Sequence, residues 1–227
     1  MSESVEIKDL RTPDAIESGS LAIIDAEVPE PRPYAGHEWT VVRRMIHATA
    51  DFELLDLVRF HHGAVAAALV ALARGGLVLT DTEMARAGLP LRRFNPLGSR
   101  VECLMNDPEV IRRAKVQGTT RAAAAVDVAT ERYDNLEGSI LLVGNAPTAL
   151  LRILEKCTDG AIAPALVLGM PVGFVNAAES KALLVEQSPV PYIAVSGRKG
   201  GSAMAAAALN ALAQLALDAR SSDSDRG

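Results

Sequence analysis

The chain has 227 residues, a formal net charge of −5, 49% hydrophobic residues and 22% charged residues. This length can bury one substantial core, and the acidic balance excludes a general nucleic-acid binder, which would need a surplus of Lys and Arg. The longest apolar runs, around 64–73 and 203–217, are too short or too polar to span a bilayer, so we expect no membrane partner either.

Two helices are predicted at the start of the chain. Thr12 is the expected cap of the first helix, with Pro13 in its first turn, and the prolines between 29 and 33 end it. The second helix is predicted from about 37 to 50. Its apolar positions recur at helical spacing and predict one buried stripe, formed by Val41, Val42, Met45 and Ile46.

From residue 63 onward, short apolar runs alternate with helical segments. We expect strands at 77–80, 101–105, 140–143, 165–168 and 192–195. We expect helices at 63–74, 108–116, 119–133, 147–156, 177–186 and 202–220. Continuous apolar strands joined by helices indicate a parallel sheet covered on both faces. The prediction is therefore one α/β domain over 1–220, a three-layer doubly wound sheet of about five parallel strands with two N-terminal helices, followed by a polar tail at 221–227.

The cysteines and the N-terminal segment indicate the compartment. Cys103 and Cys157 lie in apolar segments without metal-ligand spacing, so we expect two buried thiols in a reducing environment. The first residues include Glu3, Glu6 and Asp9 and contain no apolar core, which argues against a signal peptide. We therefore predict a cytoplasmic protein.

One histidine lies among charged residues at the end of the second predicted helix. His47 follows Arg43 by four residues, on the same helical face, with Arg44 beside it and the acidic pair Asp51 and Glu53 just beyond. An imidazole can exchange a proton near neutral pH, and arginines can hold anions beside it. The arrangement favours proton chemistry on a substrate that carries carboxylates, although an isolated histidine is more often structural.

The loops after the predicted strands are the expected place for a ligand, since open parallel sheets bind ligands beyond the carboxyl ends of their strands. The last of these loops joins Arg198 and Lys199 to two glycines and to Ser202, the expected start of a helix. Exposed amides, a helix N-terminus and cations together attract a phosphate or a carboxylate. The loop containing Gly144 and Asn145 has a structural interpretation as well, as a tight turn before a helix.

Other kinds of site are poorly supported. The chain has no Walker pattern and no Gly-x-Gly-x-x-Gly after the first predicted strand, so we expect no nucleotide cofactor. His61 and His62 are adjacent and would diverge by roughly 100° around a helix, so we expect no metal site. There is also no Gly-x-Ser-x-Gly sequence for a serine nucleophile.

Four motifs occur in a fixed order along the chain: RRMIHAT at 43–49, GNAPTAL at 144–150, PVGFVNAAESK at 171–181 and GRKGGS at 197–202. Together they resemble the precorrin-8X methylmutase family of cobalamin biosynthesis, and the likeness covers nearly the whole chain. Two positions depart from the family pattern. Asn176 occupies a position where glycine is usual, and Ala203 and Met204 replace a common Pro-Val pair.

The resemblance implies a flavodoxin-like fold, no dissociable cofactor, and a homodimer with its site near the interface. It implies an isomerase that moves a methyl group from C11 to C12 of precorrin-8X, as a 1,5-sigmatropic shift, to give hydrogenobyrinate or its cobalt-containing equivalent. The family's catalytic histidine falls on His47, which would protonate the macrocycle, or donate a hydrogen bond to it, near the migrating methyl group. The product could then pass to the next enzyme of the pathway.

A macrocycle edged with acetate and propionate groups requires cations around it. Each charge-assisted hydrogen bond contributes about 1.5–3 kcal/mol, so several can hold a polyanion on an acidic protein. Arg121 is a candidate because it lies at a predicted helix start, although a surface position is an equally good interpretation. The predicted substrate-binding residues are Arg43, Arg44, Arg121, Arg198, Lys199 and Ser202.

Two alternative functions stay open at this point. A non-catalytic protein that carries a corrin intermediate would use the same arginines and loops. An enzyme acting on a phosphate ligand would use the loop at 198–202, although the usual phosphate fingerprints are missing. A carrier would give a stoichiometric change in the absorption spectrum, whereas an enzyme would convert excess substrate.

Overall fold

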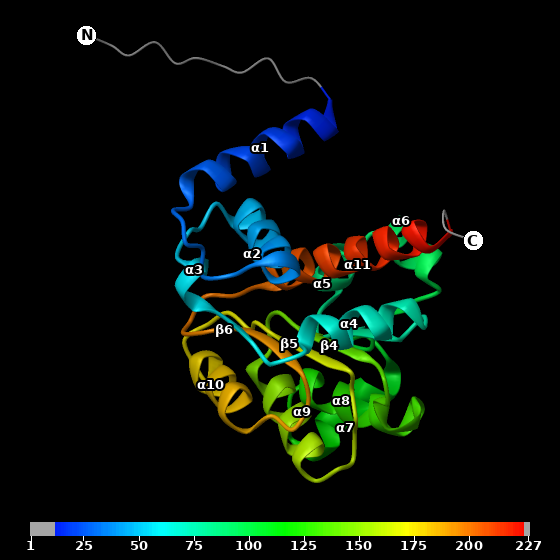
Figure 1. Cartoon of the computed structure of the whole chain (residues 1–227). Helices are drawn as coiled ribbons and strands as arrows, with labels where there is room; N and C mark the ends of the chain where they lie inside the picture. Colours follow the sequence, from blue (N-terminus) through cyan, green and yellow to red (C-terminus); the bar gives the residue numbers. More distant parts are fainter. Residues whose placement is uncertain (1–11, 225–227) are drawn as a thin grey trace.

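A six-stranded sheet separates two layers of helices in the computed structural model, which describes residues 12–224 (Figure 1). The strand order is β1-β6-β5-β4-β2-β3. The acidic segment with Glu3, Glu6 and Asp9, and the end of the expected tail at 225–227, lie outside the described residues. The strands are β1 (Val58–Phe60), β2 (Val78–Thr80), β3 (Val101–Cys103), β4 (Ile140–Val143), β5 (Leu166–Gly169) and β6 (Tyr192–Val195).

The prediction of about five strands was wrong by one, because it missed β1. The five predicted strands are present within two residues of their expected bounds, and they are all parallel to one another. β1 pairs antiparallel with β6, with Val58 opposite Val195 and Phe60 opposite Ile193. A strand of three residues is too short to show the alternation of apolar and polar side chains that identifies a strand in a sequence. β1 is therefore recognised by its pairing with β6.

The five parallel strands, numbered along the chain, lie in the order 2-1-3-4-5 across the sheet. The order changes direction between β2 and β4, and this is the point where ligands commonly bind in doubly wound folds.

The side chains of β4 alternate between the two faces of the sheet and so contact both helical layers. Ile140 and Leu142 belong to the core on one face, whereas Leu141 and Val143 belong to the core on the other.

Helices cover both faces of the sheet (Figure 1). One layer contains α2 (Gly36–Thr49), α4 (Ala64–Ala73) and α11 (Ser202–Ser224), with α1 (Pro13–Glu27) packed on the outside of α2. The other layer contains α7 (Pro108–Gln117), α8 (Arg121–Arg132), α9 (Pro147–Thr158) and α10 (Ala177–Gln187). The short helices are α3 (Leu54–Leu57), α5 (Glu83–Ala87), α6 (Leu91–Phe94), η1 (Asn95–Leu97) and η2 (Asp134–Leu136).

The two N-terminal helices form as predicted. The hydroxyl of Thr12 accepts a hydrogen bond from the backbone N–H of Ala15, and Pro13 is the first residue of α1. α1 ends at Glu27, before the prolines. The predicted stripe of α2 is confirmed, because its four residues are at most 1% exposed: Val41, Val42, Met45 and Ile46.

α11 is the longest helix and crosses the core. By length and composition, its segment Ser202–Ser222 could cross a membrane, but 67% of the apolar window is buried inside the fold. Small side chains such as Ala205 and Ala208 let α2 and α4 pack closely against it. The predicted end of this helix at 220 was four residues too early, because α11 continues to Ser224.

Both cysteines are free thiols, but only one matches the predicted burial. Cys157 is buried in α9, and burial raises the pKa of its thiol to about 11. Cys103 is only half-buried, so the prediction of two buried thiols was wrong for this residue. Burial also raises the pKa of the Cys103 thiol. Neither group is therefore a reactive thiolate at neutral pH.

Candidate functional site

The loop that joins β6 to α11, here called the β6–α11 loop (196–201), is held tightly against the end of β5. The N–H of Gly201 donates a hydrogen bond of 2.9 Å to the carbonyl oxygen of Met170. A Cβ atom on Gly200 would lie only 2.2 Å from the same oxygen, so this position requires glycine. The backbone that carries Arg198 and Lys199 is therefore fixed by its neighbours.

A buried lysine supports the same loop. Lys181 of α10 is 1% exposed, and its Nζ donates a hydrogen bond of 2.5 Å to the carbonyl oxygen of Lys199. Burial lowers the pKa of Lys181 to about 8. Sequence reasoning assigned no role to this residue. A signal was present, since Lys181 lies four residues after Ala177 and three before Leu184, in the buried stripe of its helix.

The buried lysine makes the stability of the protein depend on pH. Because its pKa is lower in the folded state than in the unfolded chain, the unfolded chain binds more protons between pH 8 and about 10.5. The free energy of unfolding of the wild type should therefore rise, relative to that of Lys181→Met, by up to about 1.4 kcal/mol per pH unit in this interval. Urea denaturation at several pH values measures this difference. For the matched variant Lys115→Met, on the exposed side of α7, the difference in the free energy of unfolding from the wild type should not change with pH.

The β6–α11 loop is also joined to the end of α2. The Nζ of Lys199 lies 2.5 Å from a carboxylate oxygen of Asp51 and 3.0 Å from one of Glu53. These two hydrogen bonds raise the pKa of Lys199. His47 lies four residues before Asp51, half-buried in the last turn of α2. The helix ends at Thr49, and its C-cap Ala50 has a left-handed backbone. The structure thus joins the predicted cation loop to the end of the helix that carries His47.

Two of the predicted binding residues are paired with acidic side chains of α1. The Nη1 atom of Arg43 lies 2.5 Å from a carboxylate oxygen of Asp25, and the Nη1 atom of Arg44 lies 2.5 Å from one of Glu17. Both partners belong to α1. The helical spacing of Arg43 and His47 is as expected, but the packing of α1 on α2 pairs both arginines with acidic side chains.

The other predicted cations are more accessible. Arg198 is exposed, and no carboxylate within residues 12–224 pairs with it. Its guanidinium carbon lies 5.4 Å from the centre of the Phe174 ring. Arg121 is exposed at the start of α8, and its Nη1 donates a hydrogen bond of 3.3 Å to the carbonyl oxygen of Met105. Both guanidinium groups can therefore donate hydrogen bonds to a carboxylate of a ligand.

At the point where the strand order reverses, a side chain of the protein occupies the backbone N–H groups that could otherwise bind a ligand. The carboxylate of Asp81 accepts hydrogen bonds from the N–H groups of Gly144, Asn145 and Ala146, at 3.0, 2.7 and 2.7 Å. Burial raises the pKa of Asp81, and these backbone hydrogen bonds oppose that effect. The amides after β4 are thus already occupied, which supports the structural interpretation of that loop.

Ser202, the last predicted binding residue, lies beside this point. It is 7% exposed, and its Oγ is 2.9 Å from the Oγ1 of Thr82. A Cβ atom on Gly144 would lie 2.7 Å from the Cα of Ser202. Ser202 therefore connects the start of α11 to the loops after β2 and β4, and its hydroxyl has an internal partner.

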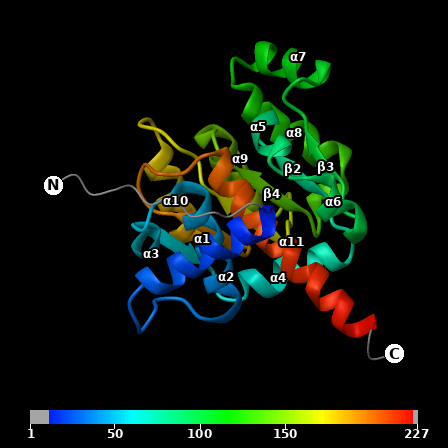
Figure 2. The ribbon, with the colours of Figure 1, turned by 90° about the horizontal axis from the view of Figure 1, so that it is seen from above.

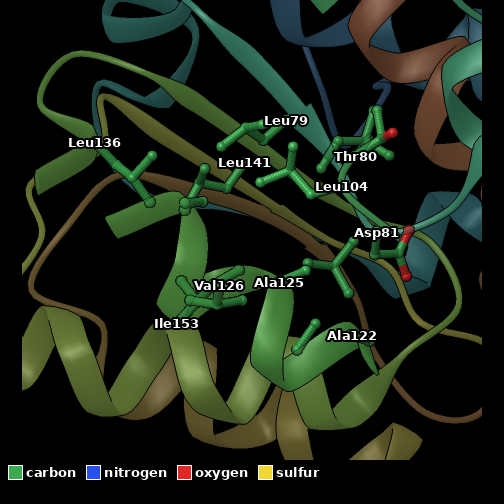
Figure 3. A pocket seen from close by; sticks show the side chains of 14 residues that line it. Leu79, Thr80, Asp81, Leu104, Ala122, Ala125, Val126, Leu136, Leu141 and Ile153 are labelled. Carbon is green, nitrogen blue, oxygen red and sulfur yellow. The ribbon is translucent and has the colours of Figure 1, made fainter. Parts of the chain in front are cut away.

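A small cavity lies between the sheet and the helices α8 and α9 (Figure 3). Leu79 and Leu141 line it from the sheet, Val126 and Ile153 line it from the helices, and Asp81 lies at its edge. Its volume is about 40 Å³, enough for about one water molecule, whereas ligand pockets usually measure about 300–1,000 Å³. This cavity is therefore too small to hold such a ligand.

Metal binding finds no support in the described part of the chain. Residues 12–224 contain no group of three or more His, Cys, Asp or Glu side chains placed to hold an ion. His61 and His62 lie in the turn between β1 and α4 rather than in a helix. The ring of His61 packs edge-on against Tyr192, with ring centres 5.5 Å apart.

Comparison with known proteins gives one consistent result. The family model described as precorrin-8X methylmutase (CbiC) matches residues 15–215. The precorrin-8X methylmutase of Pseudomonas aeruginosa is 46% identical over 205 residues, which cover 90% of this chain and 96% of that protein. The cobalt-precorrin-8 methylmutase of Leptospira interrogans is 41% identical over 202 residues, which cover 87% and 91%. A crystal structure of the Thermus thermophilus precorrin-8X methyl mutase matches with a TM-score of 0.85 at 51% identity, over 91% of this chain and 97% of that one.

Proposed function

The chain belongs to the precorrin-8X methylmutase family, and we propose that His47 is the proton donor of its reaction. The protein is an isomerase of cobalamin biosynthesis that catalyses methyl migration on a corrin-type tetrapyrrole, in our proposal the 1,5-shift from C11 to C12 of precorrin-8X. The alternative of a non-catalytic carrier is not favoured, because the relatives named above are methylmutases.

One observation supports the role of His47 most strongly. The pairing of Lys199 with Asp51 joins the end of α2 to the β6–α11 loop, so the imidazole shares an edge with the unpaired guanidinium of Arg198. A polycarboxylate bound there would meet a cation and a proton donor together. General acid catalysis of this kind contributes roughly 10²–10⁴-fold to a rate. Because the methyl shift is intramolecular, the protein has to bind, orient and polarise the ring, and no nucleophile is needed.

The cations divide into two groups in this proposal. Arg198 and Arg121 bind substrate carboxylates directly, because both are exposed and free of acidic partners among residues 12–224. Lys199 holds the loop in place. Arg43 and Arg44 contact the substrate only where its carboxylates displace Asp25 and Glu17. The hydroxyl of Ser202 fixes the start of α11 beside the bound ring.

The proposal is tested by mixing a small amount of the purified protein with a large excess of precorrin-8X. The absorption spectrum should change to that of hydrogenobyrinate over many turnovers. A change that stops at one equivalent of ligand per protein chain would instead indicate a carrier. Running the same assay with the cobalt-containing substrate identifies which of the two rings the enzyme prefers.

We also propose three properties that the family resemblance implies. The first is a homodimer with the site near its interface, supported by the exposed apolar side chains of Ile16 and Ile23 on α1, which are 48% and 41% exposed. The second is a flavodoxin-like form of the doubly wound fold, supported by the 2-1-3-4-5 order of the parallel strands. The third is a cytoplasmic location, supported by two free thiols.

A further inference from the structure

We propose that Phe174 and Val175 form an apolar platform on which one face of the substrate macrocycle lies. Both residues belong to the loop between β5 and α10 (170–176), here called the β5–α10 loop, and the proposed function gave neither of them a role. This inference rests on the proposed function, since it identifies the surface of the same site that takes the ring.

The platform is exposed although the loop that carries it is well anchored. Phe174 is 83% exposed and Val175 is 79% exposed, whereas Met170 and Ala177 at the two ends of the loop are fully buried. Within the loop, the N–H of Gly173 donates a hydrogen bond of 3.2 Å to the carbonyl oxygen of Arg198. Two large apolar side chains on a fixed loop keep a contiguous surface in water, and such a surface marks a binding site.

The chemistry beside the platform matches a flat ring with an anionic rim. The guanidinium carbon of Arg198 lies 5.4 Å from the centre of the Phe174 ring, in a cation–π contact that holds the arginine at the border of the apolar surface. An apolar ring face can cover Phe174 while a peripheral carboxylate reaches Arg198. A protein partner that covered Phe174 with a purely apolar surface would bring no anion to this guanidinium.

The position of the platform fits the site already described. The β5–α10 loop (yellow in Figure 2) lies next to the β6–α11 loop (orange), as the hydrogen bonds from Gly201 to Met170 and from Gly173 to Arg198 require. The next residue, Lys199, pairs with Asp51 one turn after His47. The platform, the free guanidinium and the proposed acid therefore lie along one edge of the sheet.

The test uses four variants of the full-length protein. Phe174→Ala and Val175→Ala remove the apolar surface, and Phe174→Tyr keeps it. Val116→Ala removes another highly exposed apolar side chain (73%), from α7, as a matched control. For each protein we would measure kcat and KM with precorrin-8X, the Kd of hydrogenobyrinate by absorption titration, and the molar mass by light scattering.

We expect Phe174→Ala to raise both KM and the product Kd by about tenfold or more, with kcat changed much less, because a contact made equally in the ground and transition states is lost. Val175→Ala should act in the same direction, and Phe174→Tyr and Val116→Ala should stay close to the wild type. Equal KM and Kd values for Phe174→Ala and Val116→Ala would overturn the platform. A molar mass of Phe174→Ala below that of the wild type would also overturn it, by assigning the side chain to a subunit contact.

The platform and the proposed function can fail separately. If the wild type bound hydrogenobyrinate without converting precorrin-8X, the isomerase role would fail, while the comparison of product Kd values would still decide the platform. If the wild type converted precorrin-8X and Phe174→Ala bound product normally, the platform alone would fail.

Discussion

His47→Ala is expected to lower kcat for precorrin-8X by about 10²–10⁴-fold while the Kd of the product corrin stays nearly unchanged. The imidazole is half-buried at the end of α2 and is not part of the buried stripe of that helix, so its removal leaves the core intact. Some rate enhancement should remain, because binding and orientation do not depend on the proton donor. Steady-state kinetics and an absorption titration on the same preparation provide both values.

Two further variants make this experiment specific. His47→Gln keeps a hydrogen-bonding side chain but cannot supply a proton at neutral pH, so it separates proton transfer from hydrogen bonding. His37→Ala changes an exposed histidine in the first turn of the same helix and should behave as the wild type. Wild-type turnover by His47→Ala would remove this residue from the mechanism.

Asp81→Ala is expected to lower the free energy of unfolding by at least about 3 kcal/mol. The carboxylate is the acceptor for three backbone N–H groups, and a buried group that loses its partner costs about 1–3 kcal/mol. The same change frees the loop of Gly144, which packs directly on Ser202 at the start of α11. Urea denaturation followed by circular dichroism measures the loss.

Asp107→Ala is the matched control for this loss. Asp107 also follows a strand of the sheet and caps a helix, but its carboxylate accepts one N–H, from Glu109 at 2.9 Å, and pairs with Arg132. Loss of a single cap costs about 0.5–2 kcal/mol. Equal losses in the two variants would show that the network around Asp81 adds nothing beyond an ordinary helix cap.

Elements with a clear local pattern could be predicted from the sequence. The bounds of β4 and β6 are those expected, because each is a continuous apolar run between turn residues, and α2 has the predicted buried stripe. β1 could not be predicted in this way. Its three residues become a strand only because β6 lies beside them, and that neighbour comes more than 130 residues later in the chain.

For the candidate site, the sequence supplied the candidate residues but not their contacts. The ion pair between Lys199 and Asp51 joins the loop with Arg198 and Lys199 to the end of the helix that carries His47. Which arginines are free could not be read from the sequence, since Arg43 and Arg44 are paired by α1, and helical spacing says nothing about a neighbouring helix.

The ion pair between Asp51 and Lys199 joins positions 148 residues apart. Closing so large a loop has an entropic cost that local helix formation does not carry, so contacts of this kind form late in folding. During synthesis the ribosome releases the N-terminal segments first, and His47 emerges long before its partners. The edge that holds the proposed acid therefore cannot assemble until β6 and the start of α11 have left the ribosome, and a chain truncated before them would lack the site altogether.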